Sequence, residues 1–188
     1  MEHPDFDKTD FSSLEVIQTG ATTVSPEFVR RLGDRFHADV QIMFGQTEAG
    51  GVMCKSLRGD PVEVIAGTVG KPYPYTELKI SDAATGETLG TDQIGEIRIR
   101  SPYMTRGYFN NPEATAAAFD AEGFLRTGDL GTLDDLGYVR VTGRLKEMII
   151  RGGEHIYPRE IEARLGDSPG IADCTVVGVP PPRWRPAV

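Results

Sequence analysis

The sequence contains few of the residues that build disulfide frameworks and metal centres. Its 188 residues include two cysteines, Cys54 and Cys174, and three histidines, His3, His37 and His155. Two distant cysteines without ligand-like spacing predict reduced packing residues of a cytosolic protein. The histidines also lack metal-ligand spacing, which argues against a structural zinc site.

Long apolar runs and an excess of positive charge are absent as well. No segment approaches the ~20 apolar residues of a membrane-spanning helix, and the charged start M-E-H-P-D-F-D-K lacks the apolar core of a signal peptide. Twenty Lys and Arg residues stand against 28 Asp and Glu residues, and the formal net charge of −8 argues against non-specific nucleic acid binding. We therefore expect a cytoplasmic protein with no transmembrane segment and no nucleic acid partner.

The residues that are present predict a mixed fold. A composition of 39% hydrophobic and 26% charged residues is ordinary for a soluble globular protein. Residues 14–18 and 39–43 are predicted strands, and between them Ser25 and Pro26 begin a helix as N-cap and first helical residue. This order indicates a parallel α/β piece, in which ligands usually bind at the carboxyl ends of the strands.

From about Gly67 the pattern changes to alternating polar and apolar residues. The alternation covers residues 77–80, 95–100 and 138–141, with Gly, Asp and Pro turns between them, and predicts a small antiparallel β-unit. A short alanine-rich helix interrupts this unit after Asn111.

A further unit is expected after residue 144. Its predicted elements are a hairpin around residues 151–153, a helix over 158–165 that ends at Gly166, and a strand over 174–177.

The segment from Thr127 to Pro158 carries candidate binding residues. It places a carboxylate (Asp129) and a guanidinium (Arg144) on turns, followed by a paired-glycine loop. A carboxylate accepts hydrogen bonds from both hydroxyls of a ribose, and arginine supplies fixed charged donors to phosphate or ribose oxygens. The pattern alone fits equally well two β-hairpins whose Gly and Asp residues only form turns.

Three motifs in order resolve this choice by resemblance. The segment Thr127–Pro158 resembles a signature of the adenylate-forming superfamily, which includes acyl-CoA synthetases, luciferases and the adenylation domains of peptide synthetases. M-F-G-Q-T-E from Met43 to Glu48 resembles the family's aromatic-Gly-x-Thr-Glu loop, and Gly95–Thr115 is similar to the segment between the two. The run G-G-E-H-I-Y-P-R-E-I-E resembles fatty or aryl acyl-CoA ligases more than amino-acid adenylation domains.

The resemblance implies a domain organisation. Family members have a large amino-terminal domain of α/β sheets and a distorted β-barrel, followed by a small α+β domain. Residues 1–145 would be the last part of the large domain, with an α/β piece over 1–66 and a β-barrel-like unit over 67–145. Residues 146–188 would begin the small domain, with Lys146 as the hinge, so that the chain is an interior slice of a longer enzyme.

The resemblance also implies the chemistry and the phosphate-side residues. A carboxylic acid would attack ATP to form an acyl-adenylate, and coenzyme A would then displace AMP to give a thioester. Glu48 matches the magnesium-associated glutamate, and Thr47 matches the hydroxyl that binds the α-phosphate. Phe44, beside Gly45, stands where relatives carry the aromatic residue that stacks on adenine.

The remaining roles follow in the same way. Gly20, Ala21 and Thr22 resemble the adenine loop, while Asp129 and Arg144 match the ribose-binding aspartate and the ribose- or phosphate-binding arginine. Gly152, Gly153 and Glu154 match the loop that lines the route of the thiol. We interpret Tyr108 and Phe109 as packing residues.

Two family elements do not occur in the sequence: the Ser/Thr/Gly-rich phosphate loop ending in Lys-Gly and the near-terminal lysine that assists adenylation. We therefore expect the isolated chain to be inactive. Three alternatives remain: a non-catalytic nucleotide-binding remnant, an adenylation domain that acts on a carrier protein, and a chain complemented by a second one that supplies the upstream half.

Overall fold

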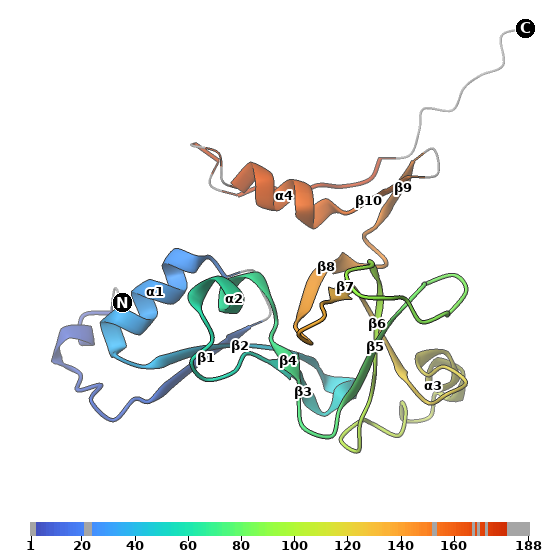
Figure 1. The fold of residues 1–188 in the computed structure, drawn as a ribbon, viewed down its shortest axis with the longest axis horizontal. Coiled ribbons are helices and arrows are strands. Elements are labelled where there is room, and N and C mark those ends of the chain that lie inside the picture. Colours follow the sequence, from blue (N-terminus) through green and yellow to red (C-terminus); the bar gives the residue numbers. More distant parts are fainter. Residues whose placement is uncertain are drawn as a thin grey trace, which may run out of the picture.

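In the part of the chain that the structure describes, the fold combines two four-stranded sheets, a separate hairpin and four α-helices (Figure 1). This agrees with the predicted mixture of α/β and α+β structure. The computed structural model describes residues 3–20, 24–151, 154–166, 168, 170, 171 and 173–179.

The first sheet has the strand order β1-β2-β3-β4. Its strands are β1 (Val16–Gly20), β2 (Asp39–Gln46), β3 (Gly51–Lys55) and β4 (Lys71–Pro72). The predicted pair β1 and β2 is parallel, as expected, whereas β3 and β4 add antiparallel strands. Both predicted strands extend further toward their carboxyl ends, so Phe44 lies within a strand rather than in a loop.

Helix α1 (Pro26–Phe36) connects β1 to β2, as predicted from its capping signal. Ser25 Oγ accepts a hydrogen bond of 3.1 Å from the Phe28 amide, which satisfies one free donor of the first turn. Helix α2 (Val62–Gly67), which the sequence did not predict, covers the same face of the sheet (Figure 1). The two helices and the sheet share one apolar cluster, consisting of Val24, Val29, Val40, Ile42 and Ile65.

The second sheet is antiparallel with the strand order β5-β6-β7-β8. Its strands are β5 (Glu77–Ser81), β6 (Gly95–Arg100), β7 (Leu125–Leu133) and β8 (Val139–Arg144). The expected β-barrel-like unit is therefore wrong in detail, since the edge strands β5 and β8 do not pair with each other and the described strands form an open sheet. Four strands are too few to close around a packed interior.

Short helical segments complete this part of the chain. Helix α3 (Pro112–Ala118) starts at the predicted Asn111, whose Oδ1 accepts a hydrogen bond of 3.0 Å from the Ala114 amide. Two 3-10 turns, η1 (Phe6–Lys8) and η2 (Thr47–Ala49), precede β1 and follow β2.

The two sheets are joined through the segment between α2 and β4. The Val69 amide donates to the Val139 carbonyl at 2.8 Å, and the Val139 amide donates to the Gly70 carbonyl at 2.9 Å. Val69 also packs against the apolar clusters of both sheets. This junction brings the carboxyl end of β2 close to β7 and β8.

The last described elements are the hairpin strands β9 (Ile149–Arg151) and β10 (Glu154–Ile156) and helix α4 (Pro158–Gly166), all near their predicted positions. The predicted strand over 174–177 is wrong, because residues 173–179 have no regular secondary structure. The Val176 amide donates instead to Glu162 Oε1 at 2.9 Å, so a helix side chain takes the place of a neighbouring strand. None of the described helices is long and apolar enough to cross a bilayer.

Candidate functional site

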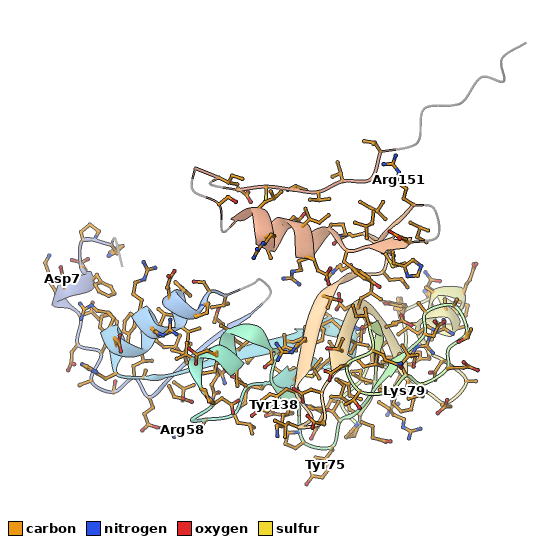
Figure 2. The ribbon with its side chains drawn as sticks, turned by 45° about the horizontal axis from the view of Figure 1, so that its top comes forward. Asp7, Arg58, Tyr75, Lys79, Tyr138 and Arg151 are labelled. Atoms are coloured by element: carbon orange, nitrogen blue, oxygen red, sulfur yellow. The ribbon has the colours of Figure 1, made fainter. Side chains whose placement is uncertain are left out.

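A cavity of about 590 Å³ lies where the two sheets meet, at the ends of β2, β7 and β8. Phe44 and Gly45 line it from β2, Asp129 from β7 and Arg144 from β8, and Gly20 lines it at the end of β1. Helix α4 lies over the strands in both views (Figures 1 and 2) and contributes further lining residues. The cavity thus joins five of the predicted binding residues, which come from four strands.

Asp129 and Arg144 face each other across the β7–β8 ladder. They are register partners, and Arg144 Nε lies 3.2 Å from Asp129 Oδ1. Asp129 is only 6% exposed, whereas the Arg144 side chain is 68% exposed. The pair therefore combines a buried carboxylate with a guanidinium that extends toward solvent.

Hydrogen bonds around the bend before Asp129 fix its position. Thr127 Oγ1 donates to the Ile97 carbonyl at 2.7 Å and accepts from the Asp129 amide at 3.1 Å. Gly128 has a φ of 72°, in the left-handed region that glycine adopts without steric cost, and its carbonyl accepts from the Leu145 amide at 2.8 Å. These contacts fix the backbone that carries the Asp129 carboxylate.

Burial dominates the electrostatics of Asp129. It raises the pKa of this carboxyl group, and the nearby Arg144 and Arg159 only partly offset that effect, while Glu147 adds to it. Apart from the ion pair with Arg144, no described residue donates a hydrogen bond to the Asp129 carboxylate. The carboxylate therefore retains acceptor capacity for ligand hydroxyl groups.

Phe44 and Gly45 occupy a β-bulge at the end of β2. Phe44 is half-buried, packs against the main apolar core and lines the cavity. A Cβ atom at Gly45 would collide with the Gly51 carbonyl oxygen, and one at Gly20 would collide with the Met43 carbonyl oxygen. These two glycines permit the close backbone approach that forms the cavity wall.

Thr47 and Glu48 lie in η2, immediately beyond β2, and are not among the cavity-lining residues. Glu48 Oε1 accepts a hydrogen bond of 2.8 Å from Tyr108 Oη, and the Glu48 carbonyl accepts one of 2.8 Å from the Thr105 amide. Packing is only part of the role of Tyr108, because its hydroxyl group also donates a hydrogen bond to the Glu48 carboxylate. Phe109 is 93% exposed, so its predicted role as a packing residue is wrong for the described chain.

The other predicted residues are placed as follows. Lys146 and Glu154 are exposed and do not line the cavity. Ala21, Thr22, Gly152 and Gly153 lie outside the described residues.

Three charged residues of the cavity were missed by the sequence analysis. Glu147 follows β8, while Arg159 and Glu162 project from α4. The usable signal was the spacing of Arg159 and Glu162, because residues three apart share one face of a helix.

A magnesium ion would need oxygen ligands in or beside the cavity. The described residues contain no cluster of three or more His, Cys, Asp or Glu side chains suited to a metal. Magnesium commonly binds through one or two carboxylates together with substrate phosphates and water, so a single carboxylate such as Glu48 fits that mode of binding.

Comparison with known proteins identifies the family to which this fold and cavity belong. A family model described as AMP-binding enzyme matches residues 1–109. The chain belongs to this family of adenylate-forming enzymes and resembles its acyl-CoA ligases.

Individual relatives agree with this assignment. The chain is 43% identical over 184 residues to a methyl-dioxo-octahydroindenyl-propanoyl:CoA ligase of Rhodococcus jostii, a match that covers 97% of the chain and 33% of the relative. The solved amide bond synthetase McbA of Marinactinospora thermotolerans has a TM-score of 0.83 at 35% identity, covering 96% of this chain and 36% of that one.

The O-succinylbenzoate CoA synthetase of Bacillus subtilis, solved with ATP and a magnesium ion, has a TM-score of 0.78 at 32% identity, covering 89% of this chain and 34% of that one. The chain therefore spans about a third of the length of the relatives it matches.

Proposed function

We propose that the chain is part of an AMP-forming acyl-CoA ligase and that its cavity binds the AMP moiety of ATP and of the acyl-adenylate. The observation that carries this proposal is the meeting of Phe44, Asp129 and Arg144 in one cavity, although 100 residues separate the first from the last. The volume of about 590 Å³ lies within the ~300–1,000 Å³ range of small-molecule sites.

Each side chain has a role in nucleotide binding that its chemistry supports. The Asp129 carboxylate accepts hydrogen bonds from the ribose hydroxyls, and Arg144 donates to ribose or phosphate oxygens. The ring of Phe44 packs against adenine through its face. Gly20 and Gly45 leave room for the base at the cavity wall, and Ala21 and Thr22 are assigned to the adenine loop by resemblance alone.

The proposed reaction has two steps. A carboxylate oxygen of the acid attacks the α-phosphorus of ATP, forming an acyl-phosphate bond while pyrophosphate leaves. The thiolate of coenzyme A then attacks the acyl carbon, and AMP leaves as the thioester forms. Positioning and neutralisation of phosphate charge account for most catalysis of this kind.

The phosphate side of the site would involve η2. Thr47 would donate a hydrogen bond from its hydroxyl group to the α-phosphate. Glu48 would hold a magnesium ion, which would neutralise part of the phosphate charge. Lys146 would act as the pivot between the two steps, and Gly152, Gly153 and Glu154 would line the thiol route. Residues 1–145 would then belong to the large domain and 146–188 to the small one.

Two observations limit what these 188 residues would do by themselves. They contain neither the Lys-Gly phosphate loop nor the near-terminal lysine, so we expect no turnover from this polypeptide alone. An assay of pyrophosphate release with ATP and a panel of fatty and aromatic acids measures this. Turnover that depends on this polypeptide alone would refute the expectation.

Calorimetric titration with AMP tests the nucleotide site. Asp129→Ala should weaken binding roughly tenfold or more, because hydrogen bonds to a charged group contribute about 1.5–3 kcal/mol. Asp135→Ala is the matched control, since Asp135 is an exposed acidic residue in the turn after β7. Equal affinities of the wild type and Asp129→Ala would contradict the proposal.

If the chain is a non-catalytic nucleotide-binding remnant, calorimetry would give the same result. No turnover would then be observed even when a second chain supplies the upstream half. An adenylation domain that acts on a carrier protein would accept a pantetheinyl protein in place of coenzyme A. The similarity to a CoA ligase and a CoA synthetase favours coenzyme A as the acceptor.

A further inference from the structure

Arg159 lines the AMP cavity, and the resemblance assigns it no role, although it lies within the run G-G-E-H-I-Y-P-R-E-I-E. It stands in the first turn of α4, after the hairpin, whereas Phe44, Asp129 and Arg144 belong to the two sheets. Arg159 also lines a smaller pocket of about 90 Å³ beside the cavity, next to Ile65 and Thr68. The guanidinium therefore stands where two adjoining hollows leave space for a ligand.

The charges of the cavity lining leave one cation available. The lining contains three carboxylates, of Asp129, Glu147 and Glu162, and two guanidinium groups. Arg144 is engaged with Asp129 at 3.2 Å. The Arg159 side chain forms no ion pair or hydrogen bond with any residue in the described ranges.

An anionic ligand needs such a cation. A nucleoside monophosphate brings negative charge into a lining where acidic groups outnumber basic ones, and Arg144 is already partly neutralised by its neighbour. Arginine keeps its charge at all relevant pH values and offers a planar fork of donors that matches phosphate oxygens. A half-buried position also reduces the screening of this charge by water.

We propose that Arg159 binds the phosphate group of AMP, so that α4 and the two sheets hold the nucleotide together. This inference rests on the proposed nucleotide site and adds to it a binding residue on the segment after Lys146. It makes occupation of the site and the position of α4 interdependent. Arg159 also contributes, with Arg144, to the positive potential at Asp129.

Paired titrations of AMP and adenosine test this role, since the two ligands differ only in the phosphate group. Wild type, Arg159→Ala, Arg159→Lys and the control Arg164→Ala are compared by calorimetry. Arg164 is an exposed cation in the last turn of the same helix. We expect Arg159→Ala to weaken AMP binding roughly tenfold, with adenosine affinity unchanged.

The Arg159→Lys variant and the melting temperatures of the proteins provide two further tests. Arg159→Lys should bind AMP with intermediate affinity, because lysine keeps the charge but loses the fork. The melting temperatures of the ligand-free proteins should agree, whereas saturating AMP should raise that of the wild type more than that of Arg159→Ala.

The outcomes separate this inference from the proposed function. Tight AMP binding by the wild type with no change in Arg159→Ala overturns the inference and leaves the nucleotide site intact. Equal weakening of AMP and adenosine also overturns it, because the loss would then not concern phosphate. If the wild type binds neither ligand, the nucleotide site and the role of Arg159 both fall.

Discussion

Tyr108 Oη donates a hydrogen bond of 2.8 Å to Glu48 Oε1, although the two residues lie 60 positions apart in the sequence. The Thr105 amide reinforces this contact by donating to the Glu48 carbonyl at 2.8 Å. Gly50, with a φ of 79°, leaves no space for a Cβ atom beside the Tyr103 carbonyl. The segment 103–108 therefore holds the η2 turn and orients the proposed magnesium ligand.

Replacing Tyr108 by Phe should loosen this attachment. The change removes one hydrogen bond to a charged group while the exposed ring is retained, so the free energy of unfolding should fall by about 1 kcal/mol or less. Hydrogen exchange at the Thr105 amide should become up to roughly tenfold faster. Tyr75→Phe is the control, because Tyr75 is 80% exposed and its hydroxyl forms no hydrogen bond with any described residue. Unchanged protection of Thr105 in Tyr108→Phe would argue against the attachment.

Replacing Asp129 by Asn should stabilise the ligand-free protein at neutral pH. Burial raises the pKa of Asp129 above its unfolded value, so the folded protein binds this proton more tightly than the unfolded chain. The stabilisation that comes from this tighter proton binding is complete below the pKa of Asp129 in the unfolded chain. It is lost as the pH rises through the pKa of Asp129 in the folded protein. Asn is neutral at every pH and avoids that loss.

Thermal unfolding across pH measures the effect of Asp129→Asn. The variant should melt higher than the wild type near pH 7, and the difference should shrink as the pH falls toward the ordinary value of 3.8. For a chain of this size, each kcal/mol corresponds to roughly 2–4 °C. A variant that melts lower at pH 7 would show that the ion pair with Arg144 outweighs burial.

Gly45→Ala should destabilise the fold, whereas Gly143→Ala should not. A Cβ atom at Gly45 would meet the Gly51 carbonyl, and rigid backbone cannot move aside easily. We expect a loss of about 1–3 kcal/mol or more. Gly143 lines the same cavity but has open space around the position of a Cβ atom, so its variant should stay within ~1 kcal/mol of the wild type. Urea denaturation midpoints measure both, and equal midpoints for the two variants would contradict the close approach.

The two cysteines should differ in reactivity. Cys54 is completely buried in the core, and burial raises its pKa to about 12. Cys174 is partly exposed. A thiol reagent should therefore modify one sulfur in the native protein and two in denaturant, and Cys174→Ser should remove the fast reaction. Rapid modification of Cys54 in folded Cys174→Ser would contradict the burial of that strand.

The elements best predicted from sequence were those with strong local signals. Ser25 with Pro26, and Asn111 with Pro112, begin α1 and α3 where capping chemistry placed them. The strand predicted over 174–177 failed because a run of apolar residues does not by itself supply a neighbouring strand. The sequence also did not predict that the second sheet stays open, since closure into a barrel depends on the number of strands rather than on the local residue pattern.

In the candidate site, too, some features could be predicted from the sequence and others depend on the fold. Asp129 and Arg144 stand out as charged residues beside glycine turns, but their direct pairing across a ladder depends on register, which the sequence does not display. Arg159 lies within the run G-G-E-H-I-Y-P-R-E-I-E, but the resemblance gives it no role in the site, and it lines the cavity because α4 lies over the strands. The hydroxyl of Tyr108 likewise gains its partner through a contact between distant loops.

Nuclear magnetic resonance during titration with AMP tests the central claim most directly, namely that distant segments form one nucleotide site. The amide resonances of Gly45, Asp129 and Arg144 should shift together and yield a single dissociation constant. The amide resonance of Gly86, which lies between β5 and β6 and does not line the cavity, should not move. Absence of shifts at these three residues, or shifts that follow different affinities, would contradict the account.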